Sequence, residues 1–148
     1  MERNTVAILF QSCVLLLALA AAMAGAGNDD AKFNLYPKTH VVIVNGFATD
    51  MLHIKCRSRD DDLGFHNLSV GQNFEFTFHP NFWHSTRIWC NFWWNGGHQS
   101  GDVYWWDHRF PQDYCVSDRH CTWKAQEDGI YSYNAAKGIF EKWYSWVK

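Results

Sequence analysis

The feature that most restricts the fold is an alternation of apolar and polar residues in short runs separated by turn residues. In residues 73–79 (NFEFTFH) three phenylalanines stand two positions apart, so in an extended strand they share one face. Similar runs recur along the chain, and no segment sustains the periodicity of an amphipathic helix. The sequence therefore predicts antiparallel strands.

The runs and their turn signals predict about eight short strands. The dipeptides at Asn45, Asn95 and Asp128 each end in glycine and mark turns. Tryptophan occurs on both faces of residues 87–94, which predicts a central strand covered on both sides. We expect an all-β fold, a small antiparallel two-sheet β-sandwich rather than an open sheet. The expected strands are 39–44, 51–56, 73–79, 87–94, 102–106, 121–125, 130–133 and 139–147.

The first residues have the layout of a secretory signal peptide. Arg3 precedes an apolar run over 6–23, and small residues at Ala22, Ala24 and Ala26 offer cleavage sites. We predict a signal peptide over 1–24, with 26 as the second possible end, followed by one domain over 25–148. An uncleaved membrane anchor is the alternative, because the run approaches the roughly 20 residues that span a bilayer. Cleavage implies extracellular release into the apoplast, with no membrane insertion of the mature chain.

The charge balance restricts the partners. The formal net charge is −2, and removing Glu2 and Arg3 with the leader leaves it unchanged. This near-neutral balance argues against nucleic acid as a partner. No motif indicates a cofactor.

Four cysteines remain after the predicted leader, an even number that favours two disulfides in an oxidising compartment. Spacing leaves three connectivities open. Because a bridge that closes a longer loop restricts the unfolded chain more, we predict Cys56 with Cys121 and Cys90 with Cys115. A four-cysteine zinc site is the alternative, but it lacks paired C-x-x-C spacing.

Catalytic and metal motifs are not evident. The eight histidines show no H-x-H or H-E-x-x-H grouping, so no metal site is predicted. No nucleophile turn of the G-x-S-x-G type occurs, so no catalytic residue is predicted. Sugar hydrolysis stays open only if carboxylates converge in the fold, although a domain this small is more often a binding module. Those carboxylates are Asp60, Asp61, Asp62, Asp102 and Asp107.

The tryptophan residues suggest that the protein could bind sugars. Trp93 and Trp94 are adjacent, as are Trp105 and Trp106, so on a strand one ring of each pair faces outward. An outward ring can stack on a sugar, or it can lie beneath a loop. Separately, residues 67–69 (NLS) form a glycosylation sequon that predicts a glycan on Asn67, in an expected loop between the second and third strands.

A set of motifs resembles the plant self-incompatibility protein family, the S-protein homologues. They are residues 52–58 (LHIKCRS), the run 60–66 (DDDLGFH), the alternating phenylalanines of 74–78, Trp89-Cys90, and 121–123 (CTW) followed by 128–131 (DGIY). The resemblance covers essentially the whole predicted mature chain. It implies a small secreted β-sandwich with two disulfides that acts as an extracellular signalling ligand, as the pollen-rejection determinant of poppy stigmas does. One departure is the length of 116–120, since the last two cysteines often stand closer together in the family.

The resemblance also suggests a role for the run of aspartates. In a noncatalytic family, three adjacent aspartates followed by Gly64 are best interpreted as a structural turn, since Asp side chains accept hydrogen bonds from nearby backbone N–H groups. Calcium loops instead require oxygen ligands at alternating positions.

We therefore expect a monomeric signalling ligand that binds an unidentified plasma-membrane receptor through loops at the ends of the sandwich. The alternative is a secreted defence or carbohydrate-binding protein that holds cell-wall glycan with exposed aromatic rings. The candidate contact segments are residues 95–102 and 111–120. Their candidate contact residues are Asn95, His98, Gln99, Asp102, Gln112, Asp113, Asp118 and Arg119.

Overall fold

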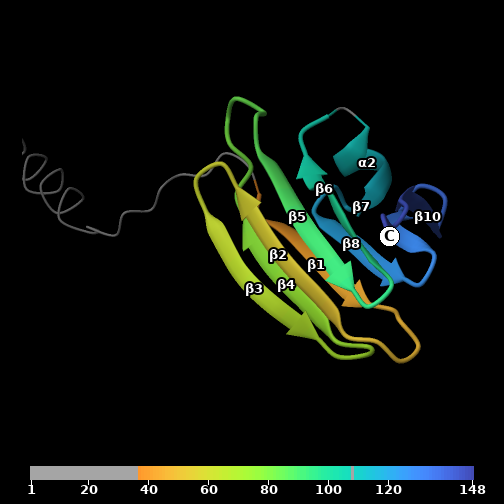
Figure 1. Ribbon diagram of the computed structural model, residues 1–148. Coiled ribbons are helices and arrows are strands. Elements are labelled where there is room, and N and C mark those ends of the chain that lie inside the picture. Colours follow the sequence, from red (N-terminus) through yellow and green to blue (C-terminus); the bar gives the residue numbers. More distant parts are fainter. Residues whose placement is uncertain (1–36, 108) are drawn as a thin grey trace, which may run out of the picture. The chain divides into compact units, whose positions relative to one another are not determined.

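In the described part of the chain ten strands form two sheets, and one short helix accompanies them (Figure 1). The computed structural model describes residues 37–107 and 109–148, so the predicted signal peptide lies outside them. The larger sheet has the order β10-β9-β8-β1-β4, with β7 also paired to β8, and the smaller has the order β3-β2-β5-β6. The elements are β1 Thr39–Asn45, β2 Leu52–Ser58, β3 Asp62–Leu68, β4 Asn73–Phe78, β5 Arg87–Trp94, β6 Gly97–Trp105, α2 Phe110–Tyr114, β7 Cys115–Val116, β8 His120–Gln126, β9 Gly129–Asn134 and β10 Ile139–Tyr144.

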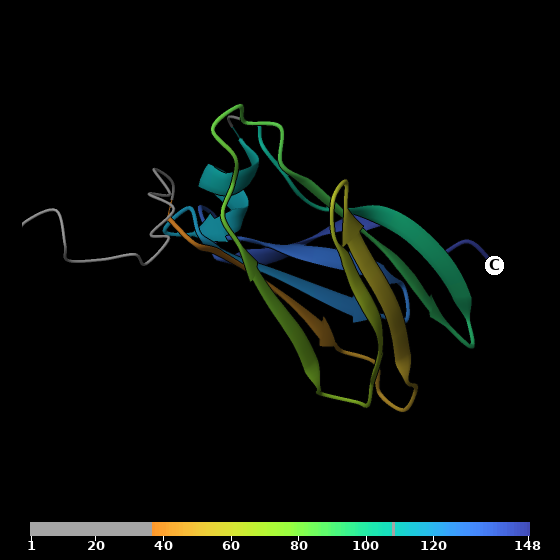
Figure 2. The ribbon, with the colours of Figure 1, turned by 90° about the vertical axis from the view of Figure 1, so that its left-hand side faces the viewer.

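The predicted all-β sandwich is confirmed, and its core lies between the sheets, which face each other in Figures 1 and 2. On β1 the side chains of Val41 and Ile43 are fully buried while their neighbours are half-buried, as the alternation predicts. The smaller sheet contributes Ile54 and Phe92 to the same core. Burial of each such side chain contributes roughly 1.5–3 kcal/mol to folding.

Strand β3 was not predicted, because the apolar residues of this segment do not alternate regularly. Gly64 has a φ of +80°, and the register against β2 shifts between Lys55 and Arg57. This bulge moves one residue out of the pairing and interrupts the alternation. The sequence also missed β7, which is two residues long, and the five-residue helix α2, because both are too short to show a period.

One strand pair contradicts the predicted antiparallel arrangement. Strand β1 pairs in parallel with β8, from His40 opposite His120 to Asn45 opposite Ala125, and it pairs antiparallel with β4 on its other side. The alternation along a strand defines its buried face but carries no information about the direction of its neighbour. A parallel neighbour requires a long crossover, here the whole chain between β1 and β8.

Residues 87–94 were predicted to form a central strand covered on both faces; the central position is confirmed, and the cover on the second face is not. Strand β5 lies between β2 and β6. Its inward side chains, Ile88, Cys90 and Phe92, are buried, but Trp89 and Trp93 on the outer face are only half-buried. On this face the Arg57 guanidinium lies 5.7 Å from the centroid of the Trp89 ring.

The predicted disulfide pairing was wrong. Cys56 bonds to Cys90, and Cys115 bonds to Cys121. Cys56 and Cys90 stand opposite each other on β2 and β5, and Cys115 and Cys121 stand opposite each other on β7 and β8. Each predicted pair would have joined cysteines that lie on different sheets. The pairing failed because strand register, and not loop length, decides which cysteines meet.

Candidate functional site

Two exposed aromatic rings occupy the loop between β4 and β5, residues 79–86. The side chain of Trp83 is 81% exposed and that of Phe82 is 62% exposed. Their ring centroids lie 5.4 Å apart in an edge-to-face arrangement. Tryptophan is enriched among the residues that dominate binding energy at interfaces, so this exposed pair marks the loop as a candidate contact surface.

The loop is closed by hydrogen bonds from a single asparagine. The Asn81 Oδ1 atom accepts the backbone N–H of Ser85 at 2.9 Å, and its Nδ2 atom donates to the Ser85 hydroxyl at 2.8 Å. The backbone N–H of Asn81 donates to the Thr86 hydroxyl at 2.8 Å. These bonds hold the loop in one conformation, which lowers the entropy lost when its rings bind a partner.

The base of this loop packs on the chain that follows β6. The His84 ring stacks on Trp106 with centroids 4.2 Å apart and planes 9° apart. Trp106 also lines a cavity of about 260 Å³ together with Gln112, Asp118 and Arg119. Tyr104 also lines this cavity, and burial raises its pKa to about 12, so its hydroxyl stays protonated even in moderately alkaline solution.

The aspartate run forms a turn at the same end of the sandwich. The Ser58 hydroxyl accepts the backbone N–H of Asp61 at 3.0 Å, and Asp62 Oδ1 accepts the backbone N–H of Gly64 at 2.9 Å. That second bond, with Lys55 nearby, holds the pKa of Asp62 below its ordinary value. The run therefore shapes a turn, as predicted, and the turn borders a cavity of about 470 Å³ beside the β4–β5 loop. We define the α2 end as the surface made by the aspartate turn, the β4–β5 loop and the β7–β8 turn. It comprises residues 58–61, 79–86 and 117–119 with Trp106 and Gln112.

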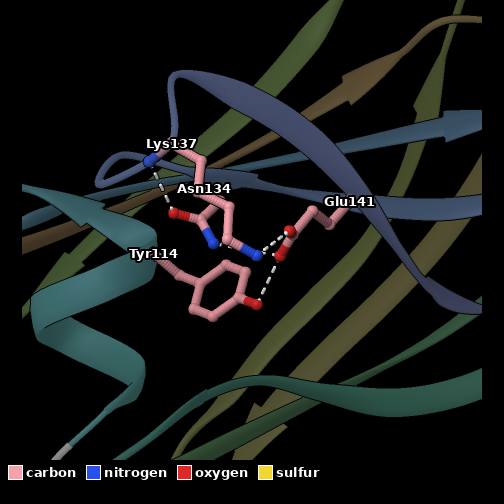
Figure 3. A network of polar contacts seen from close by, with 4 residues as sticks. All are labelled: Tyr114, Asn134, Lys137 and Glu141. Atoms are coloured by element: carbon pink, nitrogen blue, oxygen red, sulfur yellow. Dashed lines mark hydrogen bonds and ion pairs between the residues drawn. The ribbon is translucent and has the colours of Figure 1, made fainter.

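A polar network fixes helix α2 beside this end (Figure 3). The Glu141 carboxylate on β10 accepts the Tyr114 hydroxyl at 2.5 Å and the Asn134 amide at 3.0 Å, and it pairs with the Lys137 ammonium at 2.7 Å. Lys137, then Tyr114 and Asn134, lower the pKa of Glu141 to about 2. The network ties α2 to the β9–β10 hairpin and so positions one wall of the α2 end.

Comparison with known proteins decides the family. The family model for plant self-incompatibility protein S1 matches residues 40–146. The chain belongs to this family.

Its curated relatives and a solved structure agree with that assignment. S-protein homolog 24 of Arabidopsis thaliana is 42% identical over 66% of this chain, and the match spans 63% of that relative, just under two thirds of its length. S-protein homolog 1 of the same plant is 37% identical over 70% of each chain. A structure described as that of self-incompatibility protein homologues, a widespread family of small, highly stable, secreted plant proteins, superposes with a TM-score of 0.60 over 77% of this chain and 98% of that one. At 17% identity it shows the fold.

In this S-protein homologue the two predicted contact segments begin at opposite ends of the sandwich. Residues 111–120 form α2, β7 and a turn at the α2 end, while 95–102 begins beyond the other end of β5 and continues as strand β6. Eight residues of β5 separate the ends by about 25 Å. The segments were expected to be loops, and the structure instead makes most of both regular. Residues 95–99 stay at the far end, whereas Asp102 lies opposite Trp89, near the start of β5.

The candidate residues divide accordingly. Gln112, Asp118 and Arg119 line the cavity at the α2 end. At the other end the Asn95 amide donates to Asp50 at 2.9 Å, the His98 backbone pairs with Val147, and the Gln99 amide donates to the Ser145 carbonyl. Asp102 pairs with Arg87 at 2.8 Å on the sheet surface. Asp113 lines a separate cavity beside Tyr114.

The carboxylates considered for hydrolysis are divided between two cavities and two ion pairs. Asp60 and Asp61 both border the 470 Å³ cavity, and Asp107 borders the 260 Å³ cavity. Asp102 is paired with Arg87, and Asp62 is paired with Lys55. Within residues 37–107 and 109–148, no cluster of three metal-ligating side chains occurs. None of the helices in this described part is long and apolar enough to cross a membrane.

Sequence reasoning missed Phe82 and Trp83. Of the tryptophan pairs it considered, Trp94 and Trp105 pack against the core, while Trp106 lies against the β4–β5 loop. The available signal was two adjacent aromatics that follow the strand-ending Pro80 after one asparagine, in a stretch with Ser and Thr that does not alternate.

Proposed function

We propose that this S-protein homologue is a secreted, non-enzymatic signalling ligand that contacts a cell-surface receptor through the α2 end. The observation that carries the proposal is the 81% exposed Trp83 on a loop held by Asn81. A fixed loop with a large exposed ring, beside a cavity lined by charged and polar side chains, fits a protein interface with an aromatic anchor and a polar rim. The secreted description of the structural neighbour supports an extracellular location.

Loop position supports specificity at this surface. The β4–β5 loop and the β7–β8 turn lie outside the packed sheets, so their residues can vary without disturbing the core. Ser117 and Asp118 in that turn both have positive φ, at 52° and 58°. The turn therefore presents Asp118 and Arg119 at the cavity in a defined backbone conformation.

Binding to intact plant cells tests the proposal. Tagged, oxidatively folded protein is titrated onto the cells and competed with unlabelled protein. We expect saturable binding that Trp83→Ala weakens about 30-fold, the effect of losing roughly 2 kcal/mol at an interface anchor. Phe140→Ala, on β10 and 40% exposed, is the matched control and should leave binding unchanged. Equal binding by both variants and the parent protein would exclude the β4–β5 loop as the contact.

Sugar binding is the second candidate, because the exposed Trp83 and Phe82 rings can also stack on a pyranose. Competition with cell-wall oligosaccharides separates the two. If oligosaccharides displace the parent protein, and Trp83→Ala abolishes the binding that they displace, the surface binds cell-wall glycan. Displacement only by the unlabelled protein supports a protein receptor.

A further inference from the structure

The outer face of the smaller sheet carries a cluster of three rings. Phe65 on β3, His53 on β2 and Trp93 on β5 have centroids 5.3 to 6.1 Å apart. Phe65 is 50% exposed, and His53 and Trp93 are half-buried. Single exposed apolar residues are ordinary, but a contiguous patch indicates something that covers it.

The sequon asparagine lies on the same face beside these rings. The structure places Asn67 on β3, which corrects the expected loop position, and its side chain is exposed. Asn67 stands opposite His53, and His53 stands opposite Trp93. Phe65 precedes Asn67 by two residues on the same strand, about 7 Å away on the same face. All three rings are therefore within reach of a sugar attached at Asn67.

The Asn67 amide is oriented to carry that sugar. Its Oδ1 atom lies 2.6 Å from the His53 Nδ1 atom. N-linked glycosylation uses Nδ2 and leaves Oδ1 as an acceptor, so this contact persists in the glycosylated chain and directs Nδ2 away from the His53 nitrogen. The amide is then held beside the ring cluster instead of rotating freely.

We propose that Asn67 carries an N-linked glycan whose first sugar packs its C–H face over Phe65 and the adjoining rings. The glycan then covers the exposed aromatic patch and shields β3, the edge strand of its sheet, from pairing with other chains. Asn67 is the penultimate residue of β3, and Figures 1 and 2 show the β3–β4 turn that follows at the opposite end from the β4–β5 loop. The glycan therefore leaves the α2 end accessible. The inference rests on the proposed secretion, because the sequon meets the glycosylation machinery only in the secretory pathway.

A cycle of variants in the full chain, expressed in plant cells, tests the glycan and its packing. Ser69→Ala removes the sequon and keeps the Asn67 contact with His53. We expect intact mass to show a glycan on the parent, absent in Ser69→Ala, and the melting temperature of Ser69→Ala to fall by about 4 °C, the shift for roughly 1 kcal/mol in a chain of this size. In a Phe65→Ala background, adding Ser69→Ala should cause no further fall.

Phe140→Ala is the matched aromatic control on the other sheet, and adding Ser69→Ala to it should still lower the melting temperature by the same amount. If Ser69→Ala lowers the melting temperature equally in the Phe65→Ala and Phe140→Ala backgrounds, the glycan does not pack over Phe65. If the chain is unglycosylated but has lost the predicted signal peptide, it was secreted, and only this inference is overturned. An unglycosylated chain that keeps the signal peptide would overturn both the inference and the proposed secretion.

Discussion

The Trp123 indole N–H on β8 donates a 2.8 Å hydrogen bond to the Val103 carbonyl on β6, and so joins the two sheets inside the core. Both residues are fully buried. A buried carbonyl that loses its donor costs about 1–3 kcal/mol, and a smaller ring leaves a cavity as well. Trp123→Phe should therefore lower the free energy of unfolding by about 2–4 kcal/mol.

Urea unfolding followed by far-UV circular dichroism measures this change. Trp83→Phe is the control, because that ring is exposed, and it should change stability by no more than about 0.5 kcal/mol. Equal effects of the two substitutions would show that the bond between Trp123 and Val103 contributes nothing to holding the sheets together.

The two disulfides should differ in their contribution to stability. The bond between Cys56 and Cys90 closes 34 residues of sequence separation, and that between Cys115 and Cys121 closes 6. On the chain-entropy account the first contributes about 3.8 kcal/mol and the second about 2.2 kcal/mol. Thermal unfolding of the paired Cys→Ala variants should rank them in that order. The reverse order would show that native-state contacts outweigh loop entropy here.

Glu141 should make stability depend on acid pH. Its pKa in the folded chain is about 2, below the ordinary value of 4.5, so the unfolded state binds more protons between these values. The stabilisation is fully present above about pH 4.5 and is lost as pH falls towards 2. Glu141→Gln keeps acceptors for Tyr114 but does not titrate, so its unfolding free energy should change less steeply over this window.

Urea midpoints measured from pH 5 to pH 2 test this prediction. Asp62 and Asp128 also have lowered pKa values, so the variant should keep part of the slope. Identical slopes for the variant and the parent would contradict a role for the Glu141 network in folding.

The turn made by the aspartate run should tolerate changes according to backbone conformation. Gly64 has a φ of +80°, and a Cβ there would meet nothing closer than the His66 ring at 3.8 Å. Gly64→Ala should therefore cost about 1–2 kcal/mol from the backbone conformation alone. Gly64→Asn should cost less, because Asn adopts positive φ more readily. Equal losses would indicate crowding instead.

Asp62→Ala removes the acceptor for the Gly64 N–H and should lower the melting temperature. Because the run forms a turn and not a calcium loop, added calcium should leave the melting temperature of the parent protein unchanged in scanning calorimetry. A rise in the parent that Asp62→Ala abolishes would assign a calcium site to this turn.

The candidate site was only partly predictable from the sequence. Gln112, Asp118 and Arg119 were proposed as contacts and do line one cavity. Asn95, His98 and Gln99 were proposed with them, yet hydrogen bonds to Asp50 and the C-terminal segment hold these residues at the other end. A polar segment between strands has the same composition whether it faces a partner or the C-terminus of its own chain. The motifs of 52–66 and 121–131 nevertheless indicated the family correctly.

The sequence by itself determined which residues face the core, because the period of two along a strand is a local property of the backbone. The alternation and the turn residues between the runs predicted the two-sheet fold, and tryptophan on both faces of 87–94 predicted the central position of β5. The family resemblance predicted the turn at the aspartate run. Only the tertiary structure decided the parallel pairing of β1 with β8, the partners of Cys56 and Cys121, and the gathering of Trp83 and Trp106 at one end. These depend on which strands become neighbours, and that choice is made by packing between segments far apart in the chain, which no local pattern encodes.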